Sequence, residues 1–201
     1  STFKDKIVYK KINFQYNQNK NFEFNFTIKK GEKILLTGPS GSGKSTLLNI
    51  LSGLITDFKG SILIDNSVFT NKDYSTNLYG YIIQQPFLFS GTIYENITFK
   101  KINKNSKSDK KFMKIFEVCG LNNLVHSYKE VFTKKLELDS PDISGGQKQR
   151  ISIARVLYSD PKILIFDEAT NSLDAKSESD LFRKIFKFYP KQTIIIVTHR
   201  K

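Results

Sequence analysis

The sequence predicts an α/β fold with an antiparallel β flank near its N-terminal end and an inserted helical region. Two stretches, 7–16 and 22–28, alternate apolar and polar residues on either side of a polar segment, which is typical of an antiparallel hairpin. Short continuous apolar stretches at 162–166 and 192–198 are typical of parallel strands buried on both faces. Residues 86–157 carry mostly helical patterns. These three observations together predict an α/β core interrupted by a helical insertion.

The other elements can be placed from apolar periodicity and from the glycine and polar residues that bound them. Gly31 and Glu32 turn the chain out of the hairpin and into an apolar strand, which runs into a glycine-rich loop and then a helix. Within 86–157 we expect no convincing strand, and one lysine-rich stretch interrupts the helical pattern. The further elements expected are a strand at 33–37, a helix at 44–51, strands at 61–64 and 79–83, and an amphipathic helix at 175–188.

The length and composition favour one globular domain with a sizeable insertion. The chain has 201 residues, and domains typically hold about 150. Its 39% hydrophobic content supports a substantial core and excludes the disordered and collagen-like classes. We expect a single domain over 1–201, with an α/β core formed by 1–85 and 158–201 and a helical subdomain at 86–157. No apolar stretch approaches the roughly 18 residues that span a bilayer, and the first ten residues lack a secretory pattern.

The net charge of +13, from 32 basic and 19 acidic residues, raises nucleic acid or an anionic membrane surface as a partner. The excess is mostly lysine, and the densest lysine cluster, at 100–111, has no interleaved aromatic side chains that could stack on bases. We therefore expect a solvated, mobile connector there and no nucleic-acid partner. The single cysteine, Cys119, has no second cysteine for a disulfide or a zinc cluster, so we expect a small buried residue and a reducing compartment.

The stretch at 38–45, GPSGSGKS, matches the phosphate-loop pattern and stands between an expected strand and an expected helix. Successive backbone N–H groups and the helix N-terminus would surround the phosphates. Lys44 would reach the terminal phosphates, and the hydroxyl of Ser45 would bind Mg²⁺. The alternative is a glycine-rich turn without a ligand. The predicted nucleotide-phosphate-binding residues of this loop are Gly38, Pro39, Ser40, Gly41, Ser42, Gly43, Lys44, Ser45 and Thr46.

Two adjacent carboxylates follow the apolar strand at 163–166. Ligands in open α/β sheets bind just beyond the carboxyl ends of the strands, which is where these side chains stand. Asp167 would hold Mg²⁺ directly or through water, and Glu168 would polarise an attacking water. The alternative for Glu168 is an acid that only favours the dipole at a helix N-terminus.

A second candidate phosphate site lies at 143–150, ISGGQKQR. A serine and two glycines open a helix there, which leaves a hydroxyl and free N–H groups able to bind phosphate. One chain with one phosphate loop has no obvious use for two such sites on the same nucleotide. We therefore expect the second site to serve a nucleotide held by another protomer.

The chain resembles the nucleotide-binding domain of an ATP-binding cassette (ABC) transporter over nearly its whole length. Residues 38–45 resemble the Walker A loop of that family, and 163–167 resemble its Walker B strand, with Glu168 as the catalytic glutamate. The resemblance implies a P-loop NTPase fold with a RecA-like core. The residues that resemble the family's signature motif are Ser144, Gly145, Gly146 and Gln147.

The resemblance also implies roles for four single residues. Gln84 matches the Q-loop glutamine, which touches Mg²⁺ and the attacking water and senses the membrane domain. Asp174 belongs to a D-loop-like Ser-Leu-Asp sequence, and His199 matches the switch histidine that contacts the γ-phosphate. Tyr16 is in the position of the aromatic that stacks on adenine, the alternative being a simple sheet aromatic.

Within the family, the stretches at 85–93 and 96–97 resemble the exporter branch, whose ATPase domains are usually fused behind a membrane domain. This implies a transmembrane partner and a place at the cytoplasmic face of a membrane. We expect an excised domain, with a separately encoded subunit as the lesser alternative. Two departures weaken the match: residues 136–142 lack the usual glycine and glutamate before the signature, and the chain ends two residues after His199. Because of the first departure we expect weaker coupling to the membrane domain, and because of the second we expect weaker ATP hydrolysis.

The function implied is ATP hydrolysis that powers export of a substrate. ATP and Mg²⁺ would bind between the phosphate loop of one domain and the signature of a second ABC ATPase domain, either an identical chain or a sister cassette. Lys44, Gln84 and His199 would stabilise charge on the transferring phosphoryl group while Glu168 acts on the water. Two alternatives stay open: an ABC-type ATPase that acts on nucleic acid or the ribosome, and a nucleotide-gated interaction module with little turnover.

Overall fold

The computed structural model describes residues 3–17, 20–69, 77–137 and 143–198. Two compact units are present. Unit 1 consists of Ser1–Tyr81, Pro161–Ile165 and Lys191–Lys201, and unit 2 consists of Ile82–Asp160 and Phe166–Pro190. The boundaries expected between the α/β core and the helical subdomain stay a prediction.

The first sheet of unit 1 contains the antiparallel hairpin expected from the sequence. Its strand order is β2-β1-β4-β5. Ile7 of β1 pairs with Ile28 of β2 on one side and with Ile64 of β4 on the other. A bulge interrupts β1 near Lys11, and Gly60 fits against it, since a Cβ there would lie 2.3 Å from the carbonyl oxygen of Lys11. The strands are β1 (Lys6–Asn17), β2 (Lys20–Lys29), β4 (Lys59–Ile64) and β5 (Ser67–Val68).

The second sheet has the order β3-β10-β9-β6, and β10 runs parallel to β3. The continuous apolar stretches of the sequence are therefore strands of this sheet, as predicted. Strand β9 belongs to unit 1 as far as Ile165 and to unit 2 from Phe166. The bounds are β3 (Lys33–Leu36), β6 (Tyr79–Ile82), β9 (Ile163–Asp167) and β10 (Thr193–Val197).

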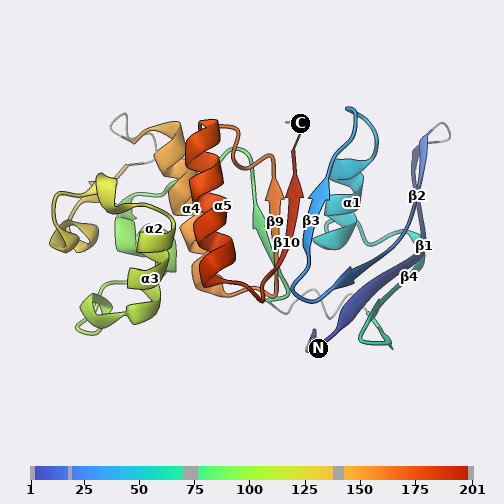
Figure 1. Cartoon of the computed structure of the whole chain (residues 1–201), viewed down its shortest axis with the longest axis horizontal. Coiled ribbons are helices and arrows are strands. Elements are labelled where there is room, and N and C mark those ends of the chain that lie inside the picture. Colours follow the sequence, from blue (N-terminus) through green and yellow to red (C-terminus); the bar gives the residue numbers. More distant parts are fainter. Residues whose placement is uncertain (1–2, 18–19, 70–76, 138–142, 199–201) are drawn as a thin grey trace. The chain divides into compact units, whose positions relative to one another are not determined.

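Helix α1 (Lys44–Leu51) supplies the centre of the core of unit 1. Leu48 and Ile50 are fully buried, and they belong to the same cluster as Ile7 of β1 and Ile195 of β10. The helix therefore joins the antiparallel sheet to the second sheet, and Figure 1 shows it between them. Burial of side chains of this size typically contributes about 1.5–3 kcal/mol each, so this packing fixes the helix that follows the phosphate loop.

Unit 2 is mainly helical, as predicted for 86–157, and it also contains α5. Tyr94 of α2, Phe112 of α3 and Phe132 form an aromatic cluster, with ring centroids 4.9 to 6.3 Å apart. The helices are α2 (Ile93–Thr98), α3 (Lys110–Val118), α4 (Gly145–Ser159) and α5 (Ala175–Phe188), with short 3₁₀ turns at Ser106–Ser108, Asn122–Leu124 and Tyr128–Phe132.

Two features of unit 2 differ from the expectations. Strands β7 (Gly91–Thr92) and β8 (Lys135–Leu136) pair in antiparallel fashion, although no strand was expected there. Two-residue strands are too short to produce a period-2 pattern. The lysine-rich stretch is also more regular than a plain connector, because it contains a 3₁₀ turn and the first residues of α3.

Two other expectations concern burial and membrane spans. Cys119 is fully buried, as expected. None of the helices in the described ranges is long and apolar enough to cross a membrane.

Candidate functional site

The phosphate loop of unit 1 links β3 to α1. Gly41 and Gly43 adopt the left-handed region, with φ of 79° and 95°, which other residues rarely tolerate. The ammonium group of Lys44 donates to the carbonyl oxygens of Gly38 and Pro39, at 2.8 and 3.0 Å. Two carbonyl groups of the loop thus hold the side chain of Lys44 over the loop. The N–H groups of the first turn of α1 have no partner within the helix, and they suit an anion.

The other predicted residues lie in this loop and in the first turn of α1, and their contact with a nucleotide stays a prediction. Ser40, Gly41 and Ser42 are exposed in the loop, and Ser45 is exposed in the first turn of α1. Thr46, also in the first turn of α1, is buried. A hydroxyl at Ser45 suits Mg²⁺, which prefers hard oxygen ligands.

Strand β10 ends beside the start of the phosphate loop. Val197 pairs with Leu36, the last residue of β3, and the N–H of Thr198 donates to the carbonyl oxygen of Leu36 at 3.4 Å. His199 lies outside the described residues, so its contact with phosphate stays a prediction. The backbone of Tyr16 lies near the end of β1, and its side chain is outside the described part of the structure.

The paired carboxylates lie at the end of β9, in unit 2. Asp167 is the last residue of the strand, and Glu168 follows it with a φ of 51°. The N–H of Asn171 donates to the carbonyl oxygen of Glu168 at 3.3 Å, which closes a turn. The side-chain amide of Asn171 donates to Oε2 of Glu168 at 3.2 Å. Both carboxylates are half-buried.

The loop that follows Glu168 is attached to α5 at several points. The hydroxyl of Thr170 donates to the carboxylate of Glu178. Asp174 is the N-cap of α5 and accepts from the N–H of Ser177 at 2.9 Å. Hydrogen bonds from Ser177, from its hydroxyl first and its N–H second, lower the pKa of Asp174. The D-loop aspartate of the prediction is therefore a helix cap in this chain.

The signature residues open α4. Ser144 is the N-cap, and the N–H of Gln147 donates to its hydroxyl at 3.3 Å, while the N–H of Ser144 donates to Oε1 of Gln147 at 2.9 Å. Gly146 lies against the D-loop, since a Cβ there would be 3.1 Å from Cδ2 of Leu173. The N–H groups of Gly145 and Gly146 are in the first helical turn, where helix geometry supplies them with no partner.

Gln84 follows β6 and is exposed in unit 2. The residue before it, Ile83, accepts a hydrogen bond at 3.2 Å from the amide of Gln149, which is fully buried in α4. The start of the predicted Q-loop is therefore tied to the signature helix. The sequence alone gave no role to Gln149, because an amide on the buried face of a helix carries no distinctive pattern.

The comparisons with known proteins decide the family. The family model described as "ABC transporter" matches residues 22–171. The chain belongs to the ABC transporter family. The predicted resemblance and the P-loop NTPase fold are confirmed. ATP hydrolysis is the general activity of such domains, so the chain is an ABC-type ATPase domain.

Relatives of this ABC domain are longer proteins. The ATP-dependent permease MDL1 of Candida albicans is 39% identical over 183 residues, which are 89% of this chain and 26% of that protein. The ABC transporter B family member 13 of Arabidopsis thaliana is 34% identical over 200 residues, which are 97% of this chain and 16% of that protein. A solved bacterial Atm1-family ABC exporter with ATP bound has a TM-score of 0.81 and 27% identity, and the match covers 98% of this chain and 34% of that one.

The predicted site residues of the ABC domain are divided between the two units. The phosphate loop and Thr198 belong to unit 1, whereas Gln84, Asp167 and the signature belong to unit 2. Joint binding of Mg²⁺ by Ser45, Gln84 and Asp167 stays a prediction. In the described ranges no cluster of three or more His, Cys, Asp or Glu side chains could hold a metal ion. A metal here would instead use hydroxyl, amide, carboxylate and phosphate oxygens.

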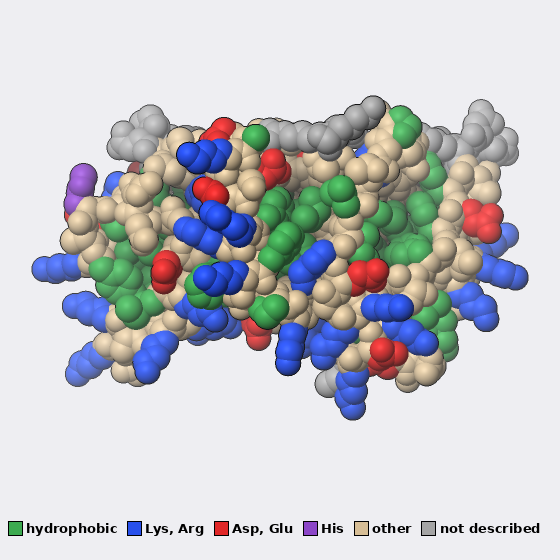
Figure 2. All heavy atoms as spheres, in the orientation of Figure 1, with side chains coloured by type: hydrophobic (Ala, Val, Ile, Leu, Met, Phe, Trp, Pro, Cys, Tyr) green, Lys and Arg blue, Asp and Glu red, His purple; other side chains and the backbone are tan. Residues whose placement is uncertain are grey.

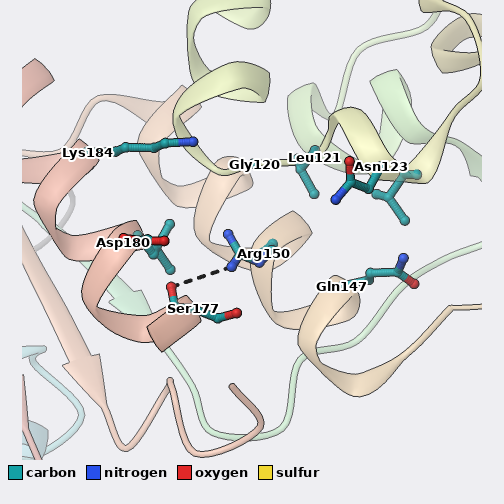
Figure 3. A pocket seen from close by; sticks show the side chains of 10 residues that line it. Gly120, Leu121, Asn123, Gln147, Arg150, Ser177, Asp180 and Lys184 are labelled. Carbon is teal, nitrogen blue, oxygen red and sulfur yellow. Dashed lines mark hydrogen bonds between the residues drawn. The ribbon is translucent and has the colours of Figure 1, made fainter. Parts of the chain in front are cut away.

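A cavity of about 330 Å³ lies within unit 2, beside the signature helix (Figure 3). Arg150 of α4 crosses its wall and donates to the carbonyl oxygens of Cys119 at 2.8 Å and Ser177 at 3.5 Å. It therefore ties the C-terminal end of α3 and the first turn of α5 to the signature helix.

Lysine and arginine side chains outnumber acidic ones on the face in Figure 2, and they project at separate points without forming one basic patch.

An exposed aromatic surface lies further along the ABC domain in unit 2. Phe87 and Phe99 are 57% and 64% exposed, and the guanidinium carbon of Arg155 lies 4.7 and 5.1 Å from their ring centroids. Arg155 itself is buried and donates to the carbonyl oxygens of Phe87 at 3.1 Å and Asn96 at 2.8 Å. Exposed apolar patches of this kind commonly mark contact surfaces. Sequence reasoning missed Arg155, because a single arginine in a helix is usually a solvated surface residue.

Proposed function

We propose that this ABC domain binds Mg·ATP and hydrolyses it within a head-to-tail pair of such domains. The observation that supports the proposal is the presence in one chain of two helix starts suited to phosphate. Helix α1 begins at the phosphate loop of unit 1, and α4 begins at the Ser144 cap of unit 2. Each start presents first-turn N–H groups and a positive dipole end to an anion. Pairing of two domains would use both starts on one nucleotide.

The phosphate loop supplies the first half of this composite site. Its N–H groups surround the β and γ phosphates, and the ammonium of Lys44 moves from the carbonyl oxygens of Gly38 and Pro39 to the phosphate oxygens. That exchange retains a charge-assisted hydrogen bond in both states, so the lysine is already held near its target. Tyr16 stacks on adenine, and His199 contacts the γ-phosphate.

The partner domain supplies the second half. The Ser144 hydroxyl and the N–H groups of Gly145 and Gly146 approach the γ-phosphate, while Gln147 holds the cap in shape. Because Gly146 lies against Leu173, the signature and the D-loop of one domain respond together to the nucleotide. Residues 169–171 link Glu168 to the D-loop, so the pairing surface is connected to the hydrolytic residue.

Glu168 orients the attacking water and accepts its proton as the new P–O bond forms and the bond to the ADP oxygen breaks. Ser45, Asp167 and Gln84 would hold Mg²⁺, which neutralises charge on the β and γ phosphate oxygens when bound. The side chains of Lys44 and His199 stabilise the charge that shifts toward ADP. Apart from this proton transfer, the scheme relies on positioning and electrostatics, as is usual for phosphoryl transfer.

The work done with this energy is export of a substrate through a transmembrane partner. The names of the MDL1 permease and the Atm1-family exporter support this branch. The exposed rings of Phe87 and Phe99, close to the predicted Q-loop, give such a partner an apolar surface. The domain then works at the cytoplasmic face of a membrane. The partner is fused upstream or is a separate subunit.

ATP binding and single-turnover hydrolysis test the proposal. Lys44→Ala is expected to abolish ATP binding, because the loop loses its charge. Glu168→Gln is expected to bind ATP normally and to hydrolyse it about a hundredfold more slowly. The matched controls are Lys59→Ala and Glu117→Gln, which make the same changes on exposed surfaces. Hydrolysis by Glu168→Gln at the wild-type rate would overturn the role of Glu168, and wild-type binding by Lys44→Ala would overturn the site.

A further inference from the structure

The loop between Glu168 and Asp174 contains an amide that contacts the proposed hydrolytic carboxylate. Nδ2 of Asn171 donates to Oε2 of Glu168 at 3.2 Å. The backbone N–H of the same Asn171 donates to the carbonyl oxygen of Glu168 at 3.3 Å. One residue therefore fixes both the main chain and the carboxylate of Glu168.

The backbone of Glu168 needs such support. Its φ of 51° lies in the left-handed region, which is unfavourable for a residue with a Cβ. Strained backbone of this kind persists where the surrounding contacts fix it, and it is common at functional sites. The turn closed by Asn171 is one such contact.

The rest of the loop holds Asn171 in place from the side of α5. The N–H of Leu173 donates to the carbonyl oxygen of Thr170 at 2.9 Å, and the hydroxyl of Thr170 donates to the carboxylate of Glu178. Asp174 caps the helix that carries Glu178. The side chain of Asn171 is exposed. The residues on both sides of it in the loop are held by hydrogen bonds.

We propose that Asn171 is a positioning residue for ATP hydrolysis, which holds the carboxylate of Glu168 in its productive rotamer. The inference rests on the proposed function of Glu168. The amide engages Oε2 of the carboxylate that acts on the attacking water. Asn171 carries no proton to or from the substrate. It removes rotational freedom from a flexible glutamate, and correct orientation of a reacting group is a large part of enzymatic rate enhancement.

The test compares one variant of the same shape with two variants that have shorter side chains. Asn171→Asp keeps the shape, removes the donor and places a second negative charge beside Glu168, so kcat is expected to fall about tenfold or more. Asn171→Ala removes the whole side-chain amide without adding a charge, and kcat is expected to fall about fivefold. Asn171→Ser keeps a shorter donor and is expected to retain more activity than either. The KM for ATP is expected to change by less than about twofold in all three, because a residue that only positions Glu168 affects the chemical step and leaves nucleotide binding unchanged.

Two further measurements separate positioning from a structural role. The side-chain amide resonance of Asn171 is expected to shift in Glu168→Ala, and Asn122→Asp on the surface is expected to keep the wild-type kcat. An unchanged kcat in Asn171→Asp, a loss that appears in KM instead, or an Asn171 resonance unaffected by Glu168→Ala would each overturn the inference. Hydrolysis by Glu168→Gln at the wild-type rate would refute the proposed function itself, and this inference with it. Slow hydrolysis by Glu168→Gln together with a wild-type kcat for Asn171→Asp would refute only the inference.

Discussion

The ring of Phe22 on β2 lies directly against Gly43, the residue that opens α1. A Cβ added at Gly43 would be 2.6 Å from Cδ1 of Phe22 and 3.4 Å from Cζ of Phe24. The two rings are parallel, with centroids 6.2 Å apart and an interplanar angle of 4°. The antiparallel sheet therefore supports the last residue of the phosphate loop from outside, in addition to the core packing of α1.

This contact makes Gly43 sensitive to any side chain. Gly43→Ala is expected to lower ATP affinity by about tenfold or more, because the φ of 95° suits only glycine and the new methyl group meets Phe22. Isothermal titration with ATP measures the effect. In the double variant Gly43→Ala with Phe22→Ala the clash is removed and the φ cost remains, so affinity is expected to recover in part. Wild-type affinity in Gly43→Ala would contradict the description of the loop.

The Ser144 cap contributes to stability independently of any nucleotide. Ser144→Ala removes the acceptor for the N–H of Gln147, and loss of an N-cap of this kind typically costs about 1 kcal/mol. The free energy of unfolding in denaturant, without ATP, is expected to fall by that amount. Ser144→Thr keeps the cap and is the control. Equal stability of Ser144→Ala and the wild type would show that the capping box does not stabilise α4.

The thiol of Cys119 is expected to be unreactive in the folded protein. Burial raises its pKa to about 12 from an ordinary value of 9.0, although the charges of Arg150 and Lys184 act in the opposite direction. The thiolate is the reactive form, so labelling by a thiol reagent at pH 8 is expected to track unfolding. Labelling at the rate of a free thiol in the native protein would contradict the burial.

The same pKa shift gives a pH dependence. Between about pH 9 and pH 12 the unfolded chain loses the Cys119 proton while the folded chain keeps it, so the thiol destabilises the fold as pH rises. The free energy of unfolding is expected to fall by up to about 1.4 kcal/mol per pH unit from this group. Tyr189, whose pKa burial also raises to about 12, contributes in the same direction. Cys119→Ala is therefore compared with the wild type at pH 8 and pH 10. A difference in unfolding free energy that does not change with pH would contradict the shift.

Arg155 is expected to be the most sensitive charged residue of unit 2. It is 8% exposed, burial lowers its pKa, and its guanidinium contacts the rings of Phe87 and Phe99. Arg155→Lys keeps the charge and loses the planar group that contacts three rings and two carbonyl oxygens at once. We expect a loss of about 2 kcal/mol in unfolding free energy, since buried hydrogen bonds to a charged group are involved. Arg183→Lys, on the exposed face of α5, is the control, and equal losses in both would contradict the account.

The parts of this structure that follow from the sequence are those with long or repeated patterns. The apolar strand at 163–166 and the GPSGSGKS loop each occupy several consecutive positions, so the sheet and the phosphate loop were predictable. The two-residue pair β7 and β8 was not, because so few residues carry no periodicity. Arg155 and Asn171 were missed for another reason: each acts through contacts with residues distant in space or across a turn, and neither residue type is unusual at its position.

The central claim is that a pair of domains hydrolyses ATP and that Glu168 acts on the attacking water. The most direct test is the molar mass of Glu168→Gln measured by light scattering. The predicted result is a monomer without nucleotide and a dimer with Mg·ATP, because binding proceeds while hydrolysis is blocked. Glu117→Gln, in which hydrolysis continues, is expected to show no lasting dimer. A Glu168→Gln protein that binds Mg·ATP and stays monomeric would contradict pairing of identical chains, and one that fails to bind ATP would contradict the site itself.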